Sequence, residues 1–397
     1  MTKDVLIFTV AAVALLLAPE AARGQEAGPA SGPTPGWSFT PAVSFGAIYD
    51  SNISLANDPA GTGRASSDQV LVVQPSGQLA FVSPRTQFTT GYAGHVRRYV
   101  DFSQLNGFDQ RAYASVRRLA TKRLTFSLGN TYAQVPTTDE LELNGVPFSL
   151  TGSRRNTASA SVDTRLTKYT NLSIVLDHTW VSFFRTEALL TGGWVAGGRA
   201  DLTRRLRERL SAGGEYAIRF AEFAEGARQV TFHDVGGTVR VGLSERTTAG
   251  FATGVSFLND RTLQESRRGP YLRADVTRDT EYARFGASFE RAFVPSFGFG
   301  GSSRSQQLRG SVHMPIDQHR MYVQGSASWR RSDPLLRDGL FLYTTALRST
   351  VGYAAARQVR LEVVYTLTRQ DTRVAGGKIN RQRVGAQVVI AQPMRIQ

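Results

Sequence analysis

Hydrophobic and polar residues alternate one by one along most of the chain from Trp37 onward. In residues 171–180, for example, Leu172, Ile174 and Leu176 are separated mostly by polar residues. Successive side chains of a β-strand point to opposite faces, so this pattern predicts strands with one apolar face. The pattern recurs in these stretches: 37–49, 69–82, 86–99, 109–119, 123–134, 155–166, 171–183, 194–206, 210–221, 229–243, 248–258, 270–278, 282–293, 305–315, 320–331, 342–354, 360–369 and 379–391.

The connections between the predicted strands alternate between long and short. The first, from Tyr49 to Asp68, is long and polar, the next, at 83–85, is tight, and the alternation continues to the last connection. Outer-membrane barrels have this rhythm, because their periplasmic turns are short and their outer loops are longer. We therefore predict an all-β fold: a closed antiparallel transmembrane β-barrel of about 18 strands over residues 37–397.

The composition agrees with a membrane barrel although no long apolar run lies within residues 37–397. The 397-residue chain is 41% hydrophobic, has a mean hydropathy of −0.23 and contains no cysteine. Only the lipid-facing half of a barrel strand has to be apolar, which explains the polar average. The absence of cysteine excludes disulfides and Cys-ligated metal sites. Aromatic residues recur at strand ends, and some should form interfacial girdles: Tyr49, Tyr99, Tyr132, Trp180, Trp194, Phe220, Phe257, Trp329, Tyr343 and Tyr353.

The N-terminal segment is typical of an exported protein. Lys3 is followed by an apolar run over 5–18 and then by small residues, which predicts a cleaved signal peptide over residues 1–24. A membrane anchor is the alternative, but the run is short for a spanning helix. Residues 25–36 are rich in Pro, Gly and Ala and predict an extended periplasmic lead-in. We thus expect the protein in the outer membrane of a Gram-negative cell.

Charged residues of the strands fall opposite the apolar rows and should therefore face the lumen. The chain has 47 Lys and Arg against 32 Asp and Glu, a formal charge of +15. A basic lumen would favour anionic solutes; the alternative is that neighbouring Arg and acidic residues only brace the wall. Arg381 and Arg383 belong to this group, and the pore-lining candidates are Arg199, Asp201, Glu215, Arg219, Arg240, Arg273, Asp275, Arg284, Glu290, Arg309, Arg330 and Glu362.

The long connection Val135–Arg154 is a candidate constriction loop. It carries Asp139, Glu140 and Glu142, whose carboxylates would face the Arg-rich wall if the loop folded inward. An inward loop of this kind is similar to that of general porins. The alternative is an ordinary outside loop, since the connection from Tyr49 to Asp68 is just as long.

Motifs of catalysis, cofactor binding and nucleic-acid binding are missing from the sequence. The five histidines lie on different stretches, and no zinc-hydrolase, nucleophile-elbow or phosphate-loop pattern occurs. His233 lies next to Asp234, but adjacent strand residues point to opposite faces. The Arg residues are dispersed and form no single patch. We therefore expect no enzyme activity, no catalytic residue, no metal, no cofactor and no nucleic-acid partner.

Two segments resemble a known family. FGAIYDSNI at 45–53 resembles the first strand of a family of outer-membrane β-barrel porins whose members often accompany exopolysaccharide or capsule production systems. INRQRVGAQVVI at 379–390 resembles the closing strand of that family and the C-terminal signal read by the barrel-assembly machinery. The chain departs from that signal, because it lacks a terminal aromatic residue and continues into the tail AQPMRIQ.

Together these features predict a porin-like channel for polar, anionic solutes. The resemblance implies a role in exopolysaccharide export, with outer-membrane lipid, the barrel-assembly machinery and polysaccharide-export components as partners. The alternative is a non-conducting structural or assembly-partner barrel of an exopolysaccharide secretion machine.

Overall fold

The computed structural model is built almost entirely of β-strands. It describes residues 35–55, 67–141, 143, 145–184, 190–224, 226–298, 300–316, 320–335, 340–372 and 377–396. The 3-10 helices η2 (Ser103–Leu105) and η3 (Thr138–Leu141) lie in connections. The strands are β1 (Gly36–Asp50), β2 (Asp68–Val82), β3 (Thr86–Tyr99), β4 (Gly107–Thr121), β5 (Leu124–Val135), β6 (Ser153–Arg165), β7 (Thr170–Phe183), β8 (Gly193–Arg207), β9 (Leu210–Phe223), β10 (Arg228–Ser244), β11 (Thr247–Asp260), β12 (Glu265–Asp279), β13 (Arg284–Ser296), β14 (Gly301–Ile316), β15 (Met321–Pro334), β16 (Leu342–Ala354), β17 (Val359–Thr372), β18 (Lys378–Ala391) and β19 (Met394–Ile396).

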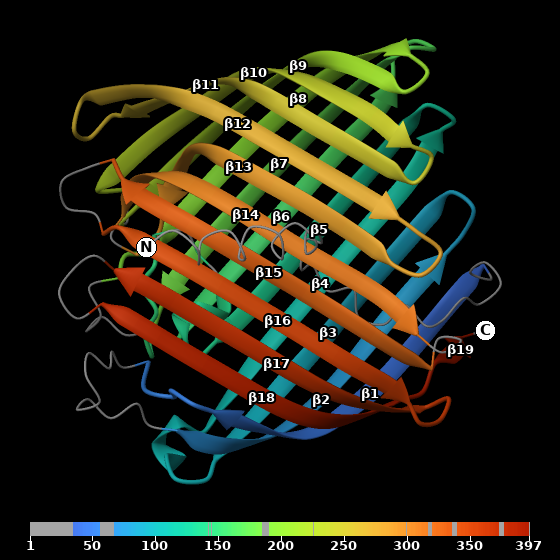
Figure 1. The fold of residues 1–397 in the computed structure, drawn as a ribbon, viewed down its shortest axis with the longest axis vertical. Coiled ribbons are helices and arrows are strands. Elements are labelled where there is room, and N and C mark those ends of the chain that lie inside the picture. Colours follow the sequence, from blue (N-terminus) through green and yellow to red (C-terminus); the bar gives the residue numbers. More distant parts are fainter. Residues whose placement is uncertain are drawn as a thin grey trace, which may run out of the picture.

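Each strand from β1 to β18 pairs antiparallel with the next, and β18 pairs with β1 to close the barrel (Figure 1). The closing seam runs from the pair Ala42–Ala391 to the pair Asp50–Arg383. The short strand β19 extends the seam, because Trp37 pairs with Ile396. The fold is therefore the predicted closed antiparallel 18-strand β-barrel, and part of the predicted C-terminal tail is a strand of its wall.

Short turns and long connections lie at opposite ends of the barrel. The short turns, such as 83–85 between β2 and β3, lie at the right of Figure 1, where β19 also ends. The long connections, such as 136–152 between β5 and β6, lie at the left. We call these the short-turn end and the long-loop end. Strand β1 begins at Gly36, while the predicted signal peptide and most of the predicted lead-in lie outside the described residues.

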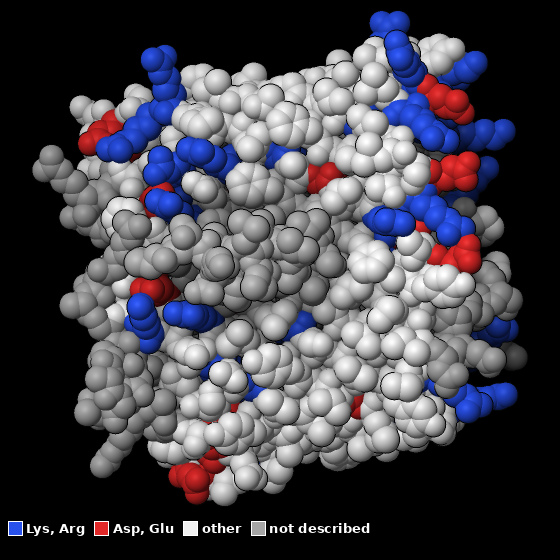
Figure 2. Space-filling view, in the orientation of Figure 1, with Lys and Arg blue, Asp and Glu red and all other residues white. Residues whose placement is uncertain are grey.

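One face of each strand is apolar and exposed, and this face is the outside of the barrel. Leu128 is 60% exposed, Leu176 54% and Val363 52%, as expected where apolar side chains have no protein neighbours. The space-filling view shows Lys and Arg gathered at the two ends, with a mostly uncharged wall between them (Figure 2). No helix among the described residues is long and apolar enough to cross a membrane.

Most strand-end aromatic residues lie on the outward face, but Tyr99 does not. Phe220 is 43% exposed and Phe257 44%, whereas Tyr99 is only 9% exposed. Tyr99 pairs with Val70 and packs with Ile53 on the inner side of the wall. Tyr99 is therefore not among the aromatic residues that could form a girdle, because the last residue of β3 falls on the inward face.

Candidate functional site

The inward face of the barrel carries all twelve pore-lining candidates, each opposite in register to the exposed apolar rows. Contacts between strands that are not neighbours prove the orientation. Arg273 on β12 reaches Glu215 on β9, with 2.7 Å between Nη2 and Oε2, and lies 3.7 Å from Asp201 on β8. Side chains on two strands that are separated by two others can come into contact only on the concave, inner side of the sheet.

The structure brings some of these candidates together and leaves others apart. Arg219 pairs with Asp234 and donates to the Phe293 carbonyl oxygen over 3.0 Å. Glu362 accepts hydrogen bonds from Tyr322 and Gln387. Arg199 lies within electrostatic reach of Glu290, and Arg330 is buried. Arg284 binds Asp279 at the short-turn rim, so it sits at the mouth of the lumen.

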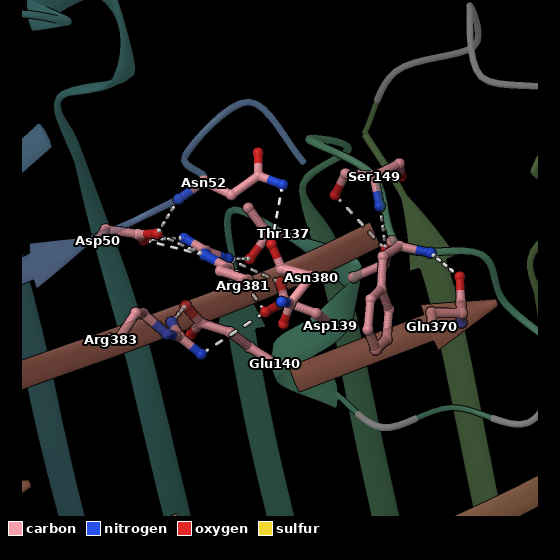
Figure 3. Close-up of polar contacts among 12 residues, drawn as sticks. Asp50, Asn52, Thr137, Asp139, Glu140, Ser149, Gln370, Asn380, Arg381 and Arg383 are labelled. Atoms are coloured by element: carbon pink, nitrogen blue, oxygen red, sulfur yellow. Dashed lines mark hydrogen bonds and ion pairs between the residues drawn. The ribbon is translucent and has the colours of Figure 1, made fainter. Parts of the chain in front are cut away.

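The connection between β5 and β6 folds against the inner wall, and we call residues 136–152 the acidic loop. Its helix η3 presents Asp139 and Glu140 to the arginines of β18 (Figure 3), and Glu140 also contacts Arg97 of β3. Glu142 lies outside the described residues. The loop therefore takes the inward position considered in the sequence analysis, not that of an ordinary outside loop.

Asp139 is held by a buried ion-pair chain at the barrel seam. Arg381 of β18 lies between two carboxylates: its Nη1 is 3.0 Å from Asp139 Oδ1, and its Nη2 is 2.6 Å from Asp50 Oδ2 (Figure 3). The Arg381 side chain is only 1% exposed. A charge buried this deeply requires such partners, because desolvation without them costs several kcal/mol, of the order of 3–5.

Glu140 is held by several arginines at once. Arg97 of β3 forms a bidentate pair with its two carboxylate oxygens, each 2.9 Å away, and Arg383 Nη1 is also 2.9 Å from Oε1. Burial would raise the pKa of Glu140, but the charges of Arg97, Arg383 and Arg111 and the hydrogen bond from Arg97 outweigh it. The pKa is therefore held well below its usual value.

Hydrogen bonds between side chains and backbone groups hold the segment 146–149 of the acidic loop. Gln370 of β17 accepts from the Phe148 amide over 2.7 Å and donates to the Val146 carbonyl oxygen over 3.1 Å. Within the loop, Thr138 Oγ1 accepts from the Ser149 amide over 2.8 Å. Gln370 therefore satisfies a backbone donor and a backbone acceptor that folding would otherwise bury unpaired.

A second inward segment, residues 292–301 at the β13–β14 connection, meets the acidic loop inside the barrel. Strand β13 stops pairing with β12 at Arg291, and Phe293 and Phe297 turn into the lumen. Gly298 and Gly145 have positive φ values of 89° and 70°, and a Cβ on Gly298 would lie 3.1 Å from the Gly145 carbonyl oxygen. Glycine is therefore required for the two segments to approach each other.

An apolar cluster packs the acidic loop and the β13–β14 connection against the inner wall of β7–β11. Phe232 and Phe223 are fully buried, and Phe297 packs on Phe223 edge to face with 5.6 Å between ring centroids. The buried members of the cluster are Val146, Val181, Val195, Ala221, Phe223, Val230, Phe232, Leu258, Phe293 and Phe297. The long-loop half of the lumen thus contains a packed core made from wall and loops.

The short-turn half of the lumen is different, because its inward side chains are polar and exposed. Ser115, Ser159 and Asp177 are exposed there, and so are Arg240 and Arg309. Water-accessible space therefore lies between these walls.

Three arginines of this half form no ion pair with any described residue: Arg240, Arg309 and Arg348. The pore candidate Asp275 leans over Gly250 toward Arg240, since a Cβ on Gly250 would lie 2.6 Å from Asp275 Oδ1. The arrangement offers positive charge and hydrogen-bond donors to small solutes that enter this half of the lumen.

The described residues contain no cluster of three or more His, Cys, Asp or Glu able to hold a metal ion. His178 and His233 lie on the outward face beside Trp194 and Tyr216. His319 lies outside the described residues.

Sequence reasoning missed Asp50, Arg97, Asp109 and Gln370 as site residues. Arg97 and Asp109 pair on the inner wall with 2.6 Å between Nε and Oδ2. The period-two pattern places Arg97 and Asp109 on the face opposite their apolar neighbours. The rule that selected the other pore-lining candidates therefore also applied to these two residues. Asp50 carried a different signal: it lies in the segment that resembles a porin first strand, and it binds Arg381 of the segment that resembles the closing strand.

Comparison with known proteins shows similarity to solved structures in fold. No protein-family model and no curated protein matches the chain. Among solved structures, OpdQ of Pseudomonas aeruginosa is 8% identical with a TM-score of 0.41, covering 91% of this chain and 98% of that chain. OccAB4 of Acinetobacter baumannii is 8% identical with a TM-score of 0.44, covering 90% and 98%. The ferric citrate transporter FecA is 10% identical with a TM-score of 0.42, covering 86% and 61%.

Proposed function

We propose that the protein is an outer-membrane channel for small polar solutes with a modest preference for anions. Two properties of the wall support a membrane position: its outward face exposes large apolar side chains, and its backbone groups are paired around a closed barrel. A lipid environment demands both properties. The short-turn end then faces the periplasm, and we place the signal peptide over residues 1–24. The barrel-assembly machinery is the proposed partner for insertion.

The observation that carries the channel proposal is the open, polar short-turn half of the lumen. Arg240, Arg309 and Arg348 project into it without ion-pair partners among the described residues. Unpaired positive charge in a water-filled lumen raises the local concentration of anions. The acidic loop narrows the other half, so we propose Asp139 and Glu140 as constriction residues.

Conductance in planar lipid bilayers tests the proposal. We expect discrete channels from the folded full-length barrel, with a reversal potential in a salt gradient that favours anions. Removal of residues 138–148 should raise the single-channel conductance, because it withdraws the acidic loop. Unchanged conductance in the deletion variant would contradict the constriction, and the absence of channels from correctly folded protein would contradict the channel itself.

A non-conducting barrel of an exopolysaccharide secretion machine is the second candidate, and the packed long-loop half favours it. Ion pairs and an apolar cluster fill this half, as expected for a barrel that another subunit opens or that serves as a scaffold. The link to polysaccharide rests on the resemblance at 45–53 and 379–390. Folded protein that inserts into bilayers without conducting, and that co-purifies with polysaccharide-export components, would support this candidate.

A further inference from the structure

The short-turn end carries a one-sided concentration of positive charge. The turn regions 117–125, 163–172 and 203–211 contain four, two and four Lys or Arg, ten in total, against two acids, Asp163 and Glu208. We call these three neighbouring turn regions the basic sector. The turns after β10 and β12 are balanced: Arg246 pairs with Glu281, and Arg284 with Asp279.

None of the ten basic side chains forms an ion pair with a described residue. Several arginines at the long-loop end, by contrast, form ion pairs with carboxylates, as in Arg381–Asp139 and Arg228–Asp260. Lys168 and Arg205 both lie near the exposed Tyr169 ring, 5.5 and 5.7 Å from its centroid. The basic sector is therefore a surface with excess positive charge that no acidic side chain of the described residues neutralises through an ion pair.

A largely apolar groove lies in the middle of the outward wall, on the strands β4–β7 that lead into the turns of this sector. Its volume is about 440 Å³. Its outward-facing lining on β4–β7 is mostly apolar, with two polar residues, Asn130 and His178, beside Ala114, Val116, Leu128, Ala158, Ala160 and Leu176. Arg118 follows Val116 two positions later on the same face and pairs with Phe126 of β5. The groove thus points toward the charged turns.

We propose that the basic sector and this groove together bind one anionic phospholipid of the periplasmic leaflet. The phosphate lies at the surface of the basic sector, attracted by the combined charge of Arg118, Lys122, Lys168 and Arg204, and an acyl chain lies in the groove. This inference rests on the proposed membrane position of the barrel. Charge complementarity identifies the headgroup, because basic side chains near a membrane surface attract anionic lipids by about a factor of five each.

The geometry matches the length of a lipid chain. Val116 and Lys122 are six positions apart, which is about 20 Å along a strand and about 14 Å along the barrel axis at a tilt of 45°. One leaflet contributes about 15 Å of hydrocarbon. An acyl chain whose phosphate rests at the turns therefore spans the groove.

Native mass spectrometry of the full-length barrel in detergent tests the site, with equal amounts of dioleoyl phosphatidylglycerol and dioleoyl phosphatidylcholine. We expect at least tenfold preferential retention of phosphatidylglycerol. The rim variant Arg118→Gln/Lys122→Gln/Lys168→Gln/Arg204→Gln should lose this preference. The control Arg246→Gln/Arg284→Gln/Arg320→Gln/Arg357→Gln removes the same charge from the other side of the rim and should keep it. Equal loss in both variants would overturn a local site.

Variants that fill the groove test the contribution of the acyl chain separately from that of the headgroup. Ala160→Phe should weaken retention of phosphatidylglycerol, whereas Ala274→Phe on the outward face of β12 should not. Soluble glycerol phosphate at millimolar concentration should fail to displace the lipid. Displacement by glycerol phosphate, or preferential binding of polyglutamate at this sector, would show a plain anion or acidic-protein surface and overturn the lipid site.

The channel and the lipid site fail in different ways. Protein that conducts in pure phosphatidylcholine bilayers but shows no preference for phosphatidylglycerol overturns the lipid site and leaves the channel proposal standing. Protein that inserts into neither type of vesicle and retains neither lipid overturns both proposals.

Discussion

The two halves of the lumen use the same residue type in opposite ways. In the long-loop half, Arg381 is 1% exposed and lies between two carboxylates, whereas in the short-turn half Arg309 is exposed and has no ion-pair partner among the described residues. Both are inward residues of barrel strands. The difference comes from the loops: where a loop brings carboxylates and apolar side chains, arginine becomes part of a core, and elsewhere it stays in water.

Substitution of Arg381 should have the largest effect on the difference between the two halves of the lumen. In Arg381→Met, Asp50 and Asp139 stay buried without their cation, which should destabilise the docked acidic loop by about 3–5 kcal/mol. Hydrogen exchange of the backbone amides of 136–152 measures this loss. Asp50→Asn/Asp139→Asn added to Arg381→Met should restore part of the protection. Unchanged exchange in the single variant would mean that the ion pairs do not hold the loop.

The apolar cluster should give the next largest effect. Phe297→Ala leaves a cavity beneath the β13–β14 connection and should cost about 3 kcal/mol of local stability. The outward Phe257→Ala, at a residue that is 44% exposed, is the matched control and should cost far less in a membrane or detergent. Exchange of the amides near 292–298 reads out both variants, and equal effects would contradict a packed core in this half.

Acid should loosen the acidic loop through Glu140. Because the folded-state pKa of Glu140 lies well below its ordinary value of 4.5, ionised Glu140 stabilises the docked state. This contribution is complete above 4.5 and is lost as the pH falls from 4.5 toward the folded-state pKa. We expect conductance to rise over that range. Glu140→Gln should flatten this part of the pH profile, and an unaltered profile would assign the transition to another group.

Charge removal in the short-turn half should have the smallest effect. Arg240→Gln/Arg309→Gln should lower the anion-to-cation permeability ratio about twofold, since unit charges 8 Å apart in water interact by about 0.5 kcal/mol. The reversal potential in a potassium chloride gradient measures the ratio. A tenfold change would show that these residues line a narrow site, and the contrast between the two halves would then disappear.

Period-two alternation was sufficient to predict the barrel, because the outside and the inside of a closed wall impose different side chains on the two faces of each strand. It also placed the twelve pore candidates on the inward face. It could not predict which arginines are buried, because Arg381 and Arg309 have the same local pattern. Their difference depends on loop contacts such as Asp139–Arg381, which join distant positions.

The β13–β14 connection shows a second limit of sequence reasoning. Residues such as Phe297 and Gly298 are also common in exposed loops, and only the presence of Phe223 and Gly145 opposite them makes an inward position stable. The short pairing of β19 with β1 was missed for a simpler reason: three residues are too few for a periodic pattern.

The closing seam also sets an order on folding. Asp50 and Arg381 are 331 positions apart, and the binding place of the acidic loop combines β18, β1 and β3. Contacts this distant in sequence form late and slowly. A sheet whose first and last strands have not yet paired offers no binding place for the acidic loop. The time at which the Thr138 and Ser149 amides become protected from hydrogen exchange would therefore report when the barrel closes.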